Sequence, residues 1–223
     1  MTHRNRRAFL GLGLGAVPAA AWPDGGPPAP VAAPRTAGRA LARLRHGNAR
    51  YAAGHSRHPH EGRGWRRSLA RGQHPFAVVL GCIDSRVPPE HIFDQGLGDL
   101  LVIRSAGHAL DEAVLGSVQY GVEELGVPLV VVLGHERCGA VSAAVRQVRT
   151  GAPVHGHLTR VVDEIAPAAR GTRFTAGDWV ENAVRANISR VCARLTRDGA
   201  FGTATVTGAL FDLDSGKVRF HRA

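Results

Sequence analysis

The chain has 223 residues, 44% of them hydrophobic, which is enough for one domain with a substantial core. Its formal net charge of +10 comes almost entirely from arginine, because Lys217 is the only lysine. Nucleic-acid-binding proteins gather such charge into a basic patch or a recognisable motif, whereas these arginines are scattered and aromatic residues make up only 5%. The composition argues against a nucleic-acid partner, and three cysteines are too few for a disulfide scaffold.

Residues 1–21 have the three-part plan of a secretory signal: a basic start, a mild apolar run from Ala8 to Ala21, and the small-residue site "AAA". Arg6 and Arg7, followed by "AFL", resemble the twin-arginine export motif. The apolar run is shorter than the ~20 residues that span a bilayer. We therefore expect export of the protein without a permanent membrane anchor. A disordered basic tail is the alternative.

Residues 22–36 are dense in Pro, Gly and Ala, so they are expected to form a linker, and the folded domain is expected over 37–223. That domain opens with a predicted N-terminal arm helix. Leu41 and Leu44 lie at helical spacing among arginines, and the helix is expected to end at Gly54.

Short apolar runs alternate with helical patterns along the rest of the chain. "FAVVLGC", "LLVIRSAG" and "PLVVVLGH" are continuous runs rich in Val and Leu, as expected of strands buried on both faces of a parallel sheet. Helices are predicted over 111–126, 140–149, 157–170 and 177–195. Two alternating runs around "DSG" in 204–221 predict a C-terminal β-hairpin. The fold class is therefore α/β, with a mostly parallel sheet flanked by helices.

Two of these strands end in residues that bind metals. "CIDSR" follows the first strand and "HERCG" ends the third, which brings Cys82, His135 and Cys138 to the carboxyl edge of the sheet, where ligands gather in such folds. Thiolate and imidazole together suit zinc better than the hard cations.

Three interpretations of these residues remain open. A catalytic zinc keeps three protein ligands and a free position, whereas a structural zinc needs a fourth ligand. The remaining cysteine, Cys192, lies mid-helix on an apolar face and is expected to be a small buried side chain. The third interpretation is two buried cysteines and an unrelated histidine.

Asp84 and Arg86 lie next to the first cysteine. Asp84 is either a fourth metal ligand or the acceptor of a hydrogen bond from a metal-bound hydroxide, and Arg86 can hold its carboxylate through a two-pronged pair. The alternative is an ordinary surface salt bridge, which contributes little.

The two motifs, in this order, resemble the zinc signature of the β-class carbonic anhydrases. The resemblance is almost continuous over "GQHPFAVVLGCIDSRVPPEHIFDQGLGDLLVIRSAG" and "AVLGSVQYGVEELGVPLVVVLGHERCGAVSAA". It implies reversible hydration of carbon dioxide to bicarbonate by zinc-bound hydroxide. It also implies a homodimer or larger homo-oligomer, with the N-terminal helix over a partner subunit and the metal near the interface.

Carried over residue by residue, the resemblance makes Cys82, His135 and Cys138 the Zn²⁺ ligands. It makes Asp84 and Arg86 the catalytic pair, with Asp84 swinging onto the zinc in a closed state. Gly139 also matches and is assigned to the substrate site.

Three positions depart from the family, and the first is Ser105, which stands where the family often has Asn. His108 stands where the family has Asn, and it is either a proton shuttle or a solvated loop residue. Val79 replaces a Trp that helps some members hold an inhibitory bicarbonate. The motifs leave two rival functions open: hydrolysis of carbonyl sulfide or carbon disulfide, and a catalytically silent zinc protein.

Overall fold

The structure is a computed structural model that describes residues 33–202 and 204–222. The predicted export signal and most of the predicted linker lie outside these residues. The first described helix, α1 (Ala37–Ala52), begins after Thr36, whose hydroxyl accepts a hydrogen bond from the Arg39 N–H. It ends before Gly54, which adopts a left-handed conformation. The N-terminal helix thus begins at the first residue of the predicted domain.

A five-stranded sheet forms the centre of the domain, in the order β2-β1-β3-β4-β5. The strands are β1 (Ala77–Cys82), β2 (Leu100–Ser105), β3 (Leu129–His135), β4 (Thr205–Phe211) and β5 (Val218–Arg222). The first four are parallel and β5 runs antiparallel to β4, which confirms the predicted sheet and C-terminal hairpin. Every residue of β1 and β3 is buried, whereas the edge strand β2 is only partly covered.

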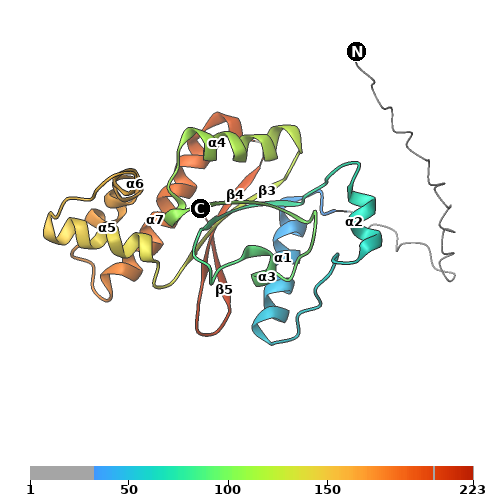
Figure 1. Ribbon diagram of the computed structural model, residues 1–223, viewed down its shortest axis with the longest axis horizontal. Coiled ribbons are helices and arrows are strands. Elements are labelled where there is room, and N and C mark those ends of the chain that lie inside the picture. Colours follow the sequence, from blue (N-terminus) through green and yellow to red (C-terminus); the bar gives the residue numbers. More distant parts are fainter. Residues whose placement is uncertain (1–32, 203, 223) are drawn as a thin grey trace, which may run out of the picture. The chain divides into compact units, whose positions relative to one another are not determined.

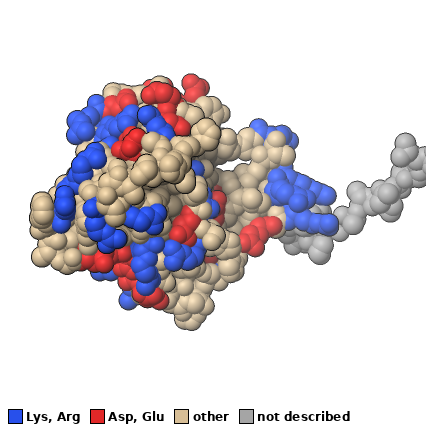
Figure 2. All heavy atoms as spheres, turned by 60° about the vertical axis from the view of Figure 1, so that its left-hand side comes forward, with Lys and Arg blue, Asp and Glu red and all other residues tan. Residues whose placement is uncertain are grey.

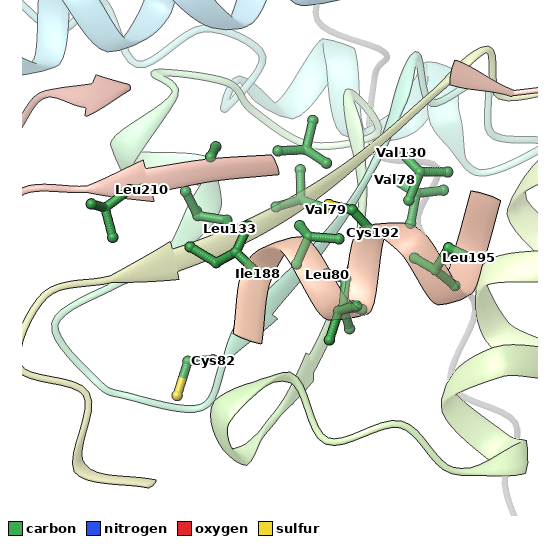
Figure 3. Close-up of a cluster of buried hydrophobic side chains, with 14 of the residues drawn as sticks. Val78, Val79, Leu80, Cys82, Val130, Leu133, Ile188, Cys192, Leu195 and Leu210 are labelled. Carbon is green, nitrogen blue, oxygen red and sulfur yellow. The ribbon is translucent and has the colours of Figure 1, made fainter. Parts of the chain in front are cut away.

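Helices cover both faces of the sheet, with α1 and α7 on opposite faces (Figures 1 and 3). After α1 they are α2 (Arg63–Leu69), α3 (Pro89–Ile92), α4 (Glu112–Gln119), α5 (Gly139–Thr150), α6 (Leu158–Gly171) and α7 (Trp179–Arg197). Short helical turns span Ala106–His108, Tyr120–Glu124 and Gly199–Phe201. The four helices predicted after the arm helix are confirmed in place, the first of them divided into α4 and the π-helical turn at Tyr120. Helices α2 and α3 were not predicted.

Helix α7 approaches the sheet closely because two strand residues opposite Ile188 are glycines. A Cβ atom on Gly134 would lie 2.4 Å from the Ile188 side chain, and one on Gly208 would lie 2.7 Å from it. Figure 3 shows Ile188, Cys192 and Leu195 on the side of α7 that faces the strands. Cys192 is 1% exposed, so it is the small buried side chain that the sequence predicts. This contact fixes α7 against the strand whose end carries His135.

Charge is distributed over the surface. On the face of Figure 2, basic and acidic side chains are interleaved. None of the helices within the described residues is long and apolar enough to cross a membrane.

Candidate metal centre

Three potential metal ligands converge at the carboxyl edge of the sheet. Cys82 is the last residue of β1, His135 is the last residue of β3, and Cys138 directly precedes α5. Their ligand atoms lie within 4.8 Å of one another, and the two sulfur atoms are 4.0 Å apart. All three side chains are buried. The structure therefore brings together the three residues that the sequence singles out.

The imidazole of His135 presents its Nε2 atom to this cluster. Its Nδ1 atom is 2.9 Å from the Glu136 carbonyl oxygen, which can only accept, so Nδ1 carries the proton and Nε2 keeps a lone pair. His135 is 0% exposed, and Nε2 is buried with no hydrogen-bond partner. An unpaired buried acceptor is costly unless something binds it. One imidazole nitrogen and two sulfurs are a donor set that fits zinc.

The two thiols have pKa values shifted in opposite directions. The pKa of Cys82 is lowered, first by the hydrogen bond with the Cys138 thiol and then by His135 and the Gly107 N–H, against the opposing effect of burial. The pKa of Cys138 is raised by that hydrogen bond with Cys82, by burial and by the nearby charge of Cys82. Two adjacent thiolates repel each other, so a cation that neutralises both favours the doubly deprotonated pair.

Asp84 lies beside the three ligands and is held by Arg86. The Arg86 Nε and Nη2 atoms donate to the two carboxylate oxygens at 2.9 and 2.7 Å, and the Arg86 backbone N–H donates at 3.0 Å. The Arg86 hydrogen bond holds the pKa of Asp84 well below its usual range. The Asp84 Oδ2 atom is 3.9 Å from His135 Nε2, so the carboxylate faces the cluster while Arg86 holds both of its oxygens.

Two further arginines fix the loops that carry these residues. Arg104 donates to the carbonyl oxygens of Cys82 and Asp84, both at 2.7 Å. Arg137 has a left-handed backbone, and its guanidinium forms a two-pronged pair with Asp214 in the β4–β5 turn. Neither arginine is among the site residues predicted from the sequence. The sequence feature that could have pointed to Arg104 is its place in the strand that ends "RSAG". For Arg137 it is its place between the potential ligands His135 and Cys138.

A cavity of about 590 Å³ opens beside the cluster. Its lining includes Cys82, Asp84 and Gly139 together with mostly apolar residues of α5, α6 and their connecting loop. A Cβ atom on Gly139 would meet no protein atom within 4 Å. The residue assigned to the substrate site therefore has a free face beside the three potential metal ligands.

His108 is not a solvated loop residue. It is 3% exposed, its Nε2 atom lies 2.7 Å from the Leu133 carbonyl oxygen, and burial lowers its pKa. A proton shuttle must exchange protons with solvent, and a buried site does not favour this exchange. The shuttle role of His108 stays a prediction. Val79, at the position of the family's Trp, is fully buried within β1.

Comparisons with known proteins agree with this geometry. The sequence profile of the carbonic anhydrase family matches residues 77–218. Carbonic anhydrase 2 of Mycobacterium tuberculosis is 41% identical over 181 residues, which cover 78% of this chain and 87% of that protein. The chain belongs to the carbonic anhydrase family. A carbonic anhydrase of Mycolicibacterium smegmatis is also 41% identical, over 78% of this chain and 88% of its own length.

Solved structures place the chain with the β-carbonic anhydrases within this family. The β-carbonic anhydrase CcaA aligns with a TM-score of 0.62 at 26% identity, over 81% of this chain and 87% of its own. CafA of Aspergillus fumigatus aligns with a TM-score of 0.63 at 27% identity, over 82% of this chain and 89% of its own. One of two tetrameric β-carbonic anhydrases from Sordaria macrospora shares the fold at 22% identity. It aligns with a TM-score of 0.63 over 82% of this chain and 95% of its own.

Proposed function

We propose that this protein is a zinc enzyme that catalyses the reversible hydration of carbon dioxide to bicarbonate and a proton. One observation carries the proposal: the unpaired Nε2 atom of His135 and the sulfurs of Cys82 and Cys138 converge beside a carboxylate that Arg86 holds. Zinc held by these three residues would keep a fourth position for a reactant, as in catalytic zinc sites. Membership of the carbonic anhydrase family supports the same reaction.

Cys82, His135 and Cys138 would hold the zinc. Zinc bound there supplies a Lewis acid that makes water a usable nucleophile near neutral pH. Asp84 then acts as a hydrogen-bond acceptor that orients the reacting water. Arg86 keeps both carboxylate oxygens turned toward its guanidinium, which keeps Asp84 from occupying the open position itself. The cavity beside the cluster, lined mostly by carbon, is suited to an apolar gas.

The Asp84–Arg86 pair also separates this proposal from a silent zinc protein. A silent site needs Asp84 on the metal, whereas here both of its oxygens accept hydrogen bonds from Arg86. Releasing them would break a charge-assisted, two-pronged interaction.

The test is turnover of carbon dioxide and of carbonyl sulfide by the zinc-loaded protein. We expect hydration of carbon dioxide to be the faster reaction by a wide margin, measured by stopped flow with a pH indicator. Turnover of carbonyl sulfide alone would overturn it in favour of the sulfur-gas hydrolase. Turnover of neither gas, with one zinc per chain confirmed, would favour the silent zinc protein.

Two further proposals concern the whole protein. We propose a homodimer or higher homo-oligomer, supported by the tetrameric relatives that share the fold.

We also propose export directed by residues 1–21, supported by their basic start and apolar run. Fusing residues 1–35 to a reporter that requires folded export tests the second proposal, and export that persists after Arg6 and Arg7 are changed to Lys would contradict the twin-arginine route.

A further inference from the structure

A tight turn after β2 reaches one of the metal ligands. The Gly107 backbone N–H points at the Cys82 sulfur, with a nitrogen-to-sulfur distance of 3.4 Å. Gly107 and His108 both have left-handed backbones, with φ values of 58° and 59°. Two consecutive residues in this region are unusual, and a non-glycine residue there persists only when its surroundings fix it.

Side chains from outside the turn fix it. Asn187 of α7 donates to the Gly107 carbonyl oxygen at 2.8 Å, and the His108 ring donates through Nε2 to the Leu133 carbonyl oxygen at 2.7 Å. Both side chains are 3% exposed. Asn187 thus lies on the buried side of α7, where its neighbours Ile188 and Val184 are apolar. A buried amide at such a position needs a partner, and the turn supplies it.

The space around Gly107 excludes any other residue. A Cβ atom there would lie 2.5 Å from the Ile165 side chain and 3.0 Å from the Ala140 side chain. The turn is therefore held between β3, α5, α6 and α7, with a single N–H directed at the sulfur.

We propose that Asn187 and His108 are positioning residues of the metal centre, which hold the Gly107 N–H on the Cys82 thiolate. A hydrogen bond to a thiolate withdraws charge from the sulfur and weakens its donation to a bound metal. In a site with two thiolates, such a hydrogen bond partly offsets their combined negative charge. The bound metal would then be a stronger Lewis acid than it would be without the hydrogen bond. Asn187 and His108 act through Gly107, and neither is among the three potential metal ligands. The inference rests on the proposed zinc site.

The test uses the full chain loaded with Co²⁺, whose thiolate-to-metal charge-transfer absorption reports the electron density on sulfur. In Asn187→Ala, and separately in His108→Leu, the charge-transfer band should move to lower energy. The zinc affinity, measured by competition with a chromophoric chelator, should fall by roughly 10-fold, because removing a group that orients a metal ligand typically costs about that factor. Asn182→Ala is the matched control, because Asn182 lies on the same helix and donates to the Thr175 and Ala176 carbonyl oxygens instead.

Folded variants with the band and affinity of the wild type would overturn the proposal. A measurement on the wild-type protein requires no variant: after loading with ¹¹³Cd, the Gly107 amide proton should show a scalar coupling to the metal through the Cys82 sulfur. Absence of that coupling from a resolved Gly107 signal would also overturn it. Both readouts are independent of turnover, so an inactive protein with the expected band shifts would contradict the proposed function and leave this inference standing.

Discussion

Cys82 and Cys192 are two buried cysteines in different surroundings. Their exposed fractions are 3% and 1%, and both belong to the hydrophobic core. Around Cys192 lie carbon atoms of the sheet and of α7 (Figure 3), and burial raises its pKa to about 12. Around Cys82 lie a second thiol, an imidazole and a backbone N–H, which outweigh burial and lower its pKa. Burial alone therefore does not set the chemistry of a thiol; the neighbouring donors do.

The difference follows from where each cysteine lies relative to the sheet. In the middle of the sheet, successive side chains meet helices on both faces, and only apolar residues are accommodated without cost. At the carboxyl ends the chain turns away, so backbone N–H groups and loop side chains become available to ligands. Cys82 is the last residue of its strand, whereas Cys192 lies against the centre of the sheet.

Removing one thiol from each region should give the largest contrast. Cys82→Ser is expected to lower zinc affinity by more than the 10–100-fold that a neighbouring hydrogen-bond partner contributes, because it removes a ligand itself. Carbon dioxide hydration should fall to the background rate. Cys192→Ala is the control and should bind one zinc per chain with unchanged affinity. A fully folded Cys192→Ala variant that bound no zinc would mean that the core around Cys192 and the metal centre are not independent.

Arg86→Ala should release Asp84 while leaving the three ligands in place. We expect kcat/KM for carbon dioxide to fall by roughly 100-fold at unchanged zinc content, because a misplaced orienting group costs about that factor. Arg86→Lys keeps the charge but loses the two-pronged geometry, so it should lie between Arg86→Ala and the wild type. Arg194→Ala removes a partner of Glu164 on α6 and is the control, with wild-type turnover. Equal activity in Arg86→Ala would show that Asp84 needs no support.

Gly107→Ala tests whether the turn over Cys82 is as tightly enclosed as the core. The added methyl group would meet Ile165 and force a left-handed alanine, so we expect a loss of about 2–3 kcal/mol in the free energy of unfolding. Gly116→Ala is the matched control: Gly116 lies within α4 with open space around it, so the same change should stabilise by about 0.5–1 kcal/mol. Urea denaturation measures both. An unchanged free energy of unfolding in Gly107→Ala would mean that the turn rearranges to accommodate the methyl group.

Cys192 should also affect the alkaline limit of stability. Its pKa is about 12 in the folded protein and near its ordinary value of 9.0 in the unfolded chain. Its contribution is complete below pH 9 and is lost as the pH rises toward 12, because only the unfolded chain releases the proton in this interval. In urea denaturation of the zinc-loaded protein, Cys192→Ala should lose less stability than the wild type between pH 9 and 11. Equal losses would mean that the thiol ionises as readily in the folded state.

Much of the fold was predictable because its signals are local. Continuous Val and Leu runs mark β1 and β3, and helical periodicity marks α5, α6 and α7. The parallel order also brings the ends of β1 and β3 together, so Cys82, His135 and Cys138 could be grouped from the sequence alone. The short helices α2 and α3 lack such a signal, since a few residues cannot display a helical period.

The supporting contacts could not be predicted in the same way. Asn187 gave one signal, a polar residue on the apolar face of a helix, but its partner Gly107 is distant in sequence and nothing local joins them. The bond between Gly107 and Cys82 depends on a left-handed turn enclosed by three helices and a strand, which is a property of the packed domain. His108 was expected in solvent or as a proton carrier; its burial follows from the same packing.

The most direct test of the central claim is a zinc titration of metal-free protein, followed by stopped-flow carbon dioxide hydration at each step. We predict that activity rises in proportion to added zinc and reaches a plateau at one zinc per chain, with no activity at zero zinc. A fully loaded protein that fails to hydrate carbon dioxide, or activity that is independent of zinc, would contradict the account.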